Sequence, residues 1–189
     1  MIARALTTGR VETSPELQQL SQKSGNLMGA GEGVAFALTQ PVGRVLLSDQ
    51  ATFQWHELAG ATGYVVSIFD SNFNKITSSP ALRHPSWTSP QLVRGRTYSW
   101  QVTATKDGKE IVSPAPPAPT AKFKILERAK ADELSRAKQT NSHLLLGVLY
   151  ARDGLLNEAE REFRELARKN PDSSVARNLL RSVQTQRAH

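Results

Sequence analysis

The apolar residues of this 189-residue chain repeat with two different periods, and the change falls near residue 127. Between about residues 34 and 126 they alternate with polar residues, as in strands that bury one face. From residue 127 onward they return at helical spacing. The sequence therefore predicts an α+β multidomain protein, in which an antiparallel β-sandwich precedes a helical domain. The predicted domains are 1–33, 34–126 and 127–189.

Short alternating runs separated by turn residues fill the middle segment, which is the pattern of a sandwich. The run TYSWQVTAT (97–105) has one apolar face, and KDGKE (106–110) contains an Asp-Gly turn sequence. We therefore expect residues 97–105 and 109–113 to form a hairpin. The four prolines of SPAPPAPT lack the backbone donor of a ladder, so they predict a polyproline stretch or an interrupted edge strand before AKFKIL (121–126).

Four residues of this segment resemble the fibronectin type III family. They are Trp55 in an early strand, Tyr64 at the start of YVVSI, and Leu92 six residues before Tyr98. The resemblance implies that Trp55 is the core tryptophan and that Tyr64 starts the third strand. It also implies that Leu92 and Tyr98 form a tyrosine corner, in which the phenol bonds back to the chain near the bend.

The segment from residue 144 to residue 173 resembles a single tetratricopeptide repeat. The matching positions are Leu146, Gly147, Tyr150, Ala159, Phe163 and Pro171, whereas His143 and Leu166 depart from the family pattern. Small residues at 147 and 159 let two antiparallel helices approach closely, aromatic side chains fill the gap, and the proline ends the second helix. The sequence thus predicts a tetratricopeptide-like α-hairpin with flanking helices.

Neighbouring periods do not continue the repeat. One repeat length later, the corresponding positions hold Arg181 and Gln184, which do not fit the repeat pattern. One repeat length earlier, they hold Ala137 and Asp132, which do not fit it either. A lone repeat cannot bury its own apolar face. We therefore expect the adjacent helices and the sandwich to cover Leu145, Val148 and Leu149. If they do not, that face is where a partner binds.

Residues 1–33 are predicted to hold a short helix and a connector. Ser14 and Pro15 of TSPELQQLSQK suit a helix start, and GNLMGAGEG (25–33) lacks the context of a phosphate-binding loop. The order of glycine-rich segment, sandwich and single repeat resembles the extracytoplasmic region of bacterial membrane-anchored regulators of the anti-sigma-factor type. The zinc-binding segment and the membrane span usual in those proteins are not found in this sequence.

The chain offers no pattern typical of catalysis. It has no cysteine, so disulfides and thiolate chemistry are excluded, and its four histidines have no metal-ligand spacing. The net charge is +7, and basic and acidic residues are mostly interleaved along the chain. One basic cluster without nearby acidic residues in the sequence consists of Arg177, Arg181 and Arg187. We interpret that cluster as a solvated helix face, with an anionic surface as the alternative. We expect no enzyme, no cofactor, no catalytic residue and no metal site.

The predicted function is a non-catalytic protein-interaction or scaffold module, which resemblance suggests is the sensing or docking part of a bacterial envelope regulator. The alternative is a carbohydrate or cell-wall binding sandwich. A third and weaker hypothesis, a nucleic-acid binder, rests on the net charge of +7 alone, and we do not expect such a partner. No run is long and apolar enough to span a membrane. The expected compartment is periplasmic if the chain is part of an anchored protein, and cytoplasmic if Met1 is the true start. The candidate binding residues are Trp87, which also suits capping of the sandwich core, with His143, Tyr150 and Asn157.

Overall fold

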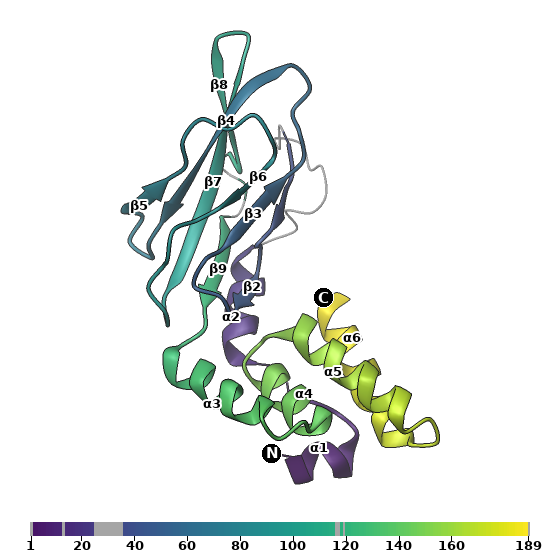
Figure 1. Cartoon of the computed structure of the whole chain (residues 1–189). Helices are drawn as coiled ribbons and strands as arrows, with labels where there is room; N and C mark the ends of the chain where they lie inside the picture. The colour runs from purple at the N-terminus through teal and green to yellow at the C-terminus, as the bar shows by residue number, and fades with distance from the viewer. Residues whose placement is uncertain (1, 13, 25–35, 116–117, 119, 189) are drawn as a thin grey trace. The chain divides into compact units, whose positions relative to one another are not determined.

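A computed structural model describes residues 2–12, 14–24, 36–115, 118 and 120–188. The chain divides into two compact units. One comprises Gln19–Leu126, and the other combines Met1–Gln18 with Glu127–His189. The fold class is α+β, as the sequence predicts: strands form the first unit, and helices dominate the second (Figure 1).

Two sheets make up the first unit. The smaller one has the order β1-β3-β6, and the larger one has the order β2-β9-β7-β4-β5, with β8 also paired to β7. Neighbouring strands are antiparallel except for the parallel pair of β2 and β9. The strands are β1 (Leu38–Gln40), β2 (Arg44–Leu46), β3 (Thr52–Trp55), β4 (Ala61–Phe69), β5 (Lys75–Ser78), β6 (Ser86–Thr88), β7 (Thr97–Lys106), β8 (Lys109–Ser113) and β9 (Ala121–Ile125).

Aromatic side chains join the two sheets in the core. The Phe53 ring of β3 lies 4.8 Å from the Trp100 ring of β7 and 5.5 Å from the Phe123 ring of β9, between ring centroids. All three side chains are fully buried. Trp100 Nε1 donates to the Pro41 carbonyl at 2.7 Å, so its polar atom is satisfied inside the core. These contacts make the unit a sandwich.

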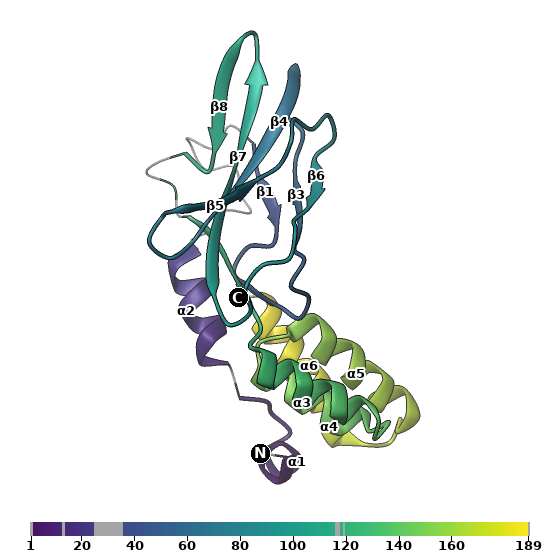
Figure 2. The same ribbon diagram turned by 60° about the vertical axis from the view of Figure 1, so that its left-hand side comes forward.

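The predicted hairpin and tyrosine corner are both present. Lys106 of β7 pairs with Lys109 of β8 across a two-residue turn, in which Asp107 and Gly108 have φ of 51° and 72° (Figure 2). Such positive values are those of a type I′ turn, which explains the Asp-Gly sequence. The Tyr98 hydroxyl donates to the Val93 carbonyl at 3.0 Å.

Other residues implied by the resemblance take slightly different places. Leu92 and Trp55 are buried in the sandwich core, as expected. Tyr64 lies inside β4, which begins at Ala61, and β4 is the fourth strand rather than the third. The prediction was wrong on this point because the short strand β2 pairs with β9 and adds one to the count.

Two strands flank the proline-rich segment and pair with the same neighbour. β8 pairs with β7 over Val102–Lys106, and β9 pairs with β7 over Thr97–Trp100. β8 and β9 therefore lie one after the other along one edge of β7, as an interrupted edge strand would. Three of the four prolines, Pro116, Pro117 and Pro119, lie outside the described residues.

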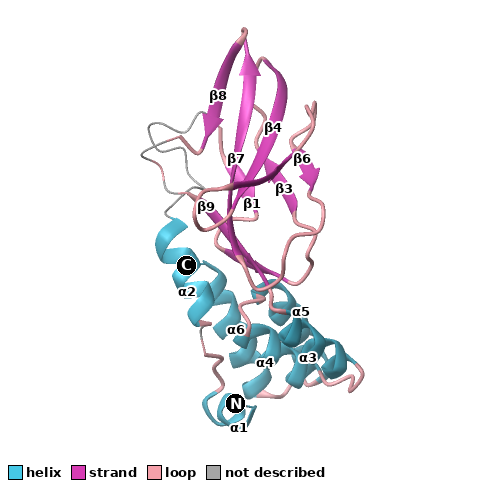
Figure 3. Ribbon diagram, turned by 90° about the vertical axis from the view of Figure 1, so that its left-hand side faces the viewer, coloured by secondary structure: helices cyan, strands magenta, loops and turns pink. Residues whose placement is uncertain are grey.

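Helices build the second unit. They are α1 (Ile2–Thr8), α3 (Arg128–Lys138), α4 (His143–Arg152), α5 (Leu156–Lys169) and α6 (Ser174–Ala188), drawn in cyan in Figure 3. Consecutive helices from α3 to α6 pack on one another. Ser142 caps α4, because its Oγ accepts from the Leu145 amide at 3.3 Å. Ser173 Oγ accepts from the Ala176 amide at 3.2 Å at the start of α6.

The N-terminal residues differ from the prediction of a separate helix and connector over 1–33. The predicted helix is present as α2 (Pro15–Ser24), whereas the glycine run 25–33 lies outside the described residues. The additional helix α1 packs against α4 and α6. Residues up to Gln18 therefore belong to the same unit as the C-terminal helices. Periodicity did not reveal this because seven residues are too few to show a clear apolar face.

Candidate binding surfaces

Helices α4 and α5 form a hairpin, and Gly147 of α4 lies very close to the Phe163 ring of α5. A Cβ atom at Gly147 would lie 2.5 Å from Phe163 Cε1 and 2.7 Å from Phe163 Cδ1. Real Cβ atoms do not approach other atoms so closely, so only glycine fits against this ring. Ala159 and Phe163 of α5 are fully buried, which matches the roles predicted for them.

The apolar face of α4 is covered in part by the N-terminal segment. Val148 and Leu149 are buried, and Leu145 is partly buried. α1 packs on α4 and α6 and places Ala5 in the core. The Val11 amide donates to Ser182 Oγ at 3.3 Å, and the Val11 carbonyl accepts from Gln186 Nε2 at 2.9 Å. The N-terminal segment, more than 100 residues before α4 in the sequence, thus buries part of the α4 face. We had expected neighbouring elements to bury it.

A cleft of about 490 Å³ remains beside this segment. Its lining includes Arg4, Ala5, Arg10, Val11, Val148 and Arg152, so it combines an apolar wall with guanidinium groups. Arg4 is paired with Glu12, Nη1 to Oε1, at 2.8 Å. The size is that of an ordinary ligand pocket.

Arg152 is held firmly at this cleft. Its guanidinium donates to both Glu133 oxygens, at 3.1 and 2.8 Å, and to both Asp153 oxygens at 2.8 Å. The bonds to Asp153, and then those to Glu133, raise the pKa of Arg152. The Asp153 side chain is 0% exposed, so the guanidinium neutralises a buried carboxylate. Arg152 is therefore a structural anchor of α4.

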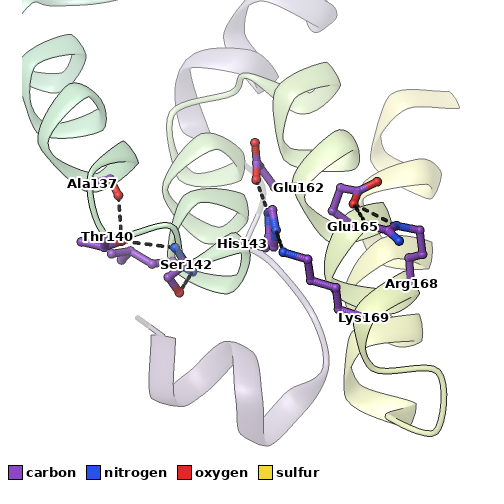
Figure 4. Close-up of polar contacts among 9 residues, drawn as sticks. Ala137, Thr140, Ser142, His143, Glu162, Glu165, Arg168 and Lys169 are labelled. Atoms are coloured by element: carbon purple, nitrogen blue, oxygen red, sulfur yellow. Dashed lines mark hydrogen bonds and ion pairs between the residues drawn. The ribbon is translucent and has the colours of Figure 1, made fainter.

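His143 joins the start of α4 to α5. Its Nδ1 lies 2.8 Å from Glu162 Oε2, and its Nε2 lies 2.8 Å from Lys169 Nζ (Figure 4). A neutral ring with its proton on Nδ1 satisfies both contacts, because it donates to the carboxylate and accepts from the ammonium. Both ring nitrogens are engaged, so this arrangement favours helix pairing over ligand binding.

The adjacent charged groups in Figure 4 are also paired. Arg168 donates to Glu165 Oε2 through Nη2 at 2.8 Å and through Nε at 3.0 Å. This bond to Arg168 lowers the pKa of Glu165. Thr140 Oγ1 donates to the Ala137 carbonyl at 2.7 Å and so closes the end of α3. The polar groups of this region stabilise helix ends.

A buried carboxylate ties α5 to α6. Glu160 Oε1 accepts from Arg164, one helical turn later, at 2.6 Å and from Gln184 at 3.2 Å. Arg187 pairs with the other oxygen. Burial raises the pKa of Glu160, but the Gln184 bond and the charges of Arg187 and Arg164 outweigh it, so the net shift is downward.

The four candidate residues belong to two different units. Trp87 belongs to the sandwich, and the other three belong to the helical unit. Tyr150 is 1% exposed, so its ring fills the helical core, which is the packing role that the repeat pattern predicts. Asn157 is exposed at the start of α5, whereas His143 contacts the later part of that helix. The two polar candidates therefore lie at opposite ends of the hairpin.

Trp87 packs on the sandwich. Its ring stacks on Phe53 with centroids 5.7 Å apart and an interplanar angle of 26°. The side chain is half-buried against the core. One ring face is thus used for packing, as the capping alternative predicts.

Among the residues that the structure describes, no cluster of three or more His, Cys, Asp or Glu side chains is placed to hold a metal ion. Among the same residues, no helix combines the length and apolar character that crossing a membrane requires.

No protein-family model matches the chain, and no curated protein matches it. Solved structures resemble about half of it. An Fn3-like protein from Clostridium thermocellum is 20% identical over 51% of this chain and 97% of its own, with a TM-score of 0.37. A fourth FNIII domain from human is 19% identical over 50% of this chain and 77% of its own, with the same TM-score of 0.37. CopC from Methylosinus trichosporium OB3b is 14% identical over 49% of this chain and 95% of its own, with a TM-score of 0.34. Likenesses this low carry no argument about function. The fibronectin type III-like character of the sandwich rests on its strand order, core and tyrosine corner.

Proposed function

We propose that this protein is a non-catalytic interaction module, whose helical unit binds an apolar helical segment of another protein. The proposed binding face is made by α4 and α6 and is the one that α1 occupies. The cleft lined by Val148 and Arg152 extends this face.

One observation supports the proposal above all: the face already receives a short helix from a distant part of the chain. α1 has only seven residues, and its residue Leu6 is 44% exposed, so it covers the face incompletely. A helix laid in a groove is a recurrent mode of peptide recognition. A partner helix with a longer apolar stripe would bury more surface than α1 does, and could therefore displace it.

The hairpin itself supports the same role. We interpret α4 and α5 as a single tetratricopeptide-like repeat, on the contact between Gly147 and Phe163. Stacked repeats of this type form extended binding surfaces. In this chain, α6 and α1 flank the hairpin instead of further repeats.

The glycan alternative has weaker support. It depends on Trp87, whose ring is partly buried and stacks on Phe53. A role in the bacterial envelope rests on the resemblance in the order of segments alone. Fractionation of cells that express the native gene tests it: the envelope proposal expects the protein outside the cytoplasm, and a purely cytoplasmic pool would contradict it.

A reversible lock on α1 tests the interaction proposal. A Cβ at Gly9 would lie 3.0 Å from Asn178 Cβ, slightly closer than in a disulfide, and Gly9 has a φ of 62°, so a cysteine there carries some backbone strain. The chain has no native cysteine that would compete for the pair. We expect the double variant Gly9→Cys, Asn178→Cys to bind partner proteins from a cell extract when reduced, and to lose them when oxidised.

Two controls define the result. A synthetic peptide of residues 2–12 should release the same proteins from the reduced chain, because it competes for the same face. The unsubstituted chain should be insensitive to the redox state. Capture that is equal in both redox states, or that the peptide does not reverse, would contradict the proposal.

A further inference from the structure

The turn between β4 and β5 is a rigid loop organised by one carboxylate. Asp70 Oδ1 accepts from the amides of Asn72 and Asn74 at 2.8 and 2.9 Å, and Oδ2 accepts from Asn74 Nδ2 at 3.0 Å. The Asp70 amide donates to the Asn74 carbonyl at 3.0 Å. The side-chain bond from Asn74 contributes most to lowering the pKa of Asp70. The loop is therefore ordered by hydrogen bonds rather than by burial.

This loop displays an aromatic ring. Phe73 is 67% exposed and has a φ of 63°, a left-handed conformation that bulky residues seldom adopt. Asn or Gly would suit this position better, and neither packing nor local geometry explains a phenylalanine. Ile76 follows on β5 and is 48% exposed. A large apolar side chain held in solvent at a strained position is a mark of an interaction surface.

The adjacent strand offers an open edge. β5 is the last strand of the larger sheet and, among the described strands, pairs only with β4. The Ser79 amide donates to the Val66 carbonyl at 2.9 Å, and the Val66 amide donates to Ser79 Oγ at 2.9 Å, so the amide of Ser79 faces β4. Because successive residues of a strand direct their backbone groups to opposite sides, the amide and carbonyl of the preceding residue, Ser78, point to the free edge. Only another extended backbone complements such a row of groups.

The charges around the edge favour an acidic partner. Lys75 is exposed on β5. The charge of Arg96 acts on the Asp70 carboxylate and contributes to lowering its pKa, so these two charges offset each other. An approaching strand would therefore meet the positive charge of Lys75 between Phe73 and Ile76.

We propose that the β5 edge, with Phe73 and Ile76, is a docking surface for an extended segment of another polypeptide that carries apolar and acidic residues. The segment adds to β5 as a further strand, while its side chains pack on the exposed apolar groups. This surface lies on the sandwich and is independent of the function proposed for the helical unit.

Selection of random 12-residue peptides displayed on phage, against the full chain, tests the proposal. We expect selected peptides to alternate apolar and acidic residues and to bind the unsubstituted chain. Ser78→Pro removes an outward-facing amide, and Phe73→Asn removes the ring at a position where Asn suits the backbone. Each substitution should weaken binding at least about tenfold, which corresponds to about 1.4 kcal/mol.

Ser78→Ala is the matched control and should bind like the unsubstituted chain. Circular dichroism and thermal unfolding should show that all three variants fold. Failure to select any peptide, or peptides that bind Ser78→Pro and Phe73→Asn undiminished, would overturn the proposal. It would also be overturned if peptides fail to bind while vesicles with anionic lipid bind through Phe73. A dimer that Ser78→Pro abolishes would assign the edge to a second copy and overturn the proposed partner.

Discussion

Substituting Gly147 by alanine tests how the helical hairpin is closed. In an open helix this change stabilises by about 1 kcal/mol, because alanine has the higher helix propensity. Here the new Cβ would lie 2.5, 2.7 and 2.8 Å from three atoms of the Phe163 ring. That ring is fully buried and cannot swing into solvent.

The expected result follows from these opposing effects. Overpacking of this kind costs about 1 to 3 kcal/mol, and three contacts below 3.0 Å place this case at the upper end. After subtracting the helix gain, Gly147→Ala should destabilise the helical unit by about 2 kcal/mol. For a unit of this size the midpoint of thermal unfolding should fall by about 10 °C.

Thermal and urea unfolding, followed by circular dichroism at the helical band, measure the effect. The control Asn157→Ala, at an exposed site on α5, should change the free energy of unfolding by less than about 0.5 kcal/mol. In a Phe163→Leu background the same alanine should become neutral or stabilising, because the clash is removed. A Gly147→Ala protein as stable as the parent, with Phe163 intact, would show that the contact with the Phe163 ring does not require glycine.

Three further substitutions test other contacts. Tyr98→Phe removes the hydroxyl that donates to Val93 and should destabilise the sandwich by about 1 kcal/mol in urea unfolding, whereas no change would argue against the tyrosine corner. Arg152→Met leaves the fully buried Asp153 without its main partner and should cost about 3 kcal/mol in the helical transition; a loss below about 0.5 kcal/mol would contradict the anchor role. Glu160 has a lowered pKa, so its stabilisation is present above the ordinary carboxyl value of 4.5 and is lost as the pH falls through the folded-state value. Glu160→Gln should therefore lose less stability than the parent on acidification below 4.5, and an unchanged pH profile would contradict the pairing.

The sequence predicted those parts of the fold that depend on local patterns. Alternation along residues 97–105 and the Asp-Gly turn located β7 and its hairpin, because strand pairing across a short turn is a local event. The spacing of Gly147 and Phe163 predicted their contact for the same reason. The packing of α1 on α4 and α6 escaped prediction, because it joins segments far apart in the chain and α1 has no clear periodicity.

The candidate surfaces were predicted less well. Tyr150 carries a hydroxyl, so it is compatible with either a core or a surface position, and only its neighbours decide the outcome. Both nitrogens of His143 are used by residues 19 and 26 positions away, which no local pattern indicates. Phe73 was not singled out, although Asp-Ser-Asn-Phe-Asn is a turn sequence in which an aromatic residue is out of place. That mismatch was the available signal.

We propose that the face of α4 and α6 receives a helical segment supplied by another molecule. An NMR titration of the full chain carrying Ala5→Glu, which places a charge at a buried position of α1 and frees the face, measures this binding. We expect a peptide of residues 2–12 to shift the amide signals of Val148 and Ser182 saturably, and the same peptide with Ala5→Glu to leave them unchanged. Absence of saturable shifts, or equal shifts with both peptides, would contradict the claim.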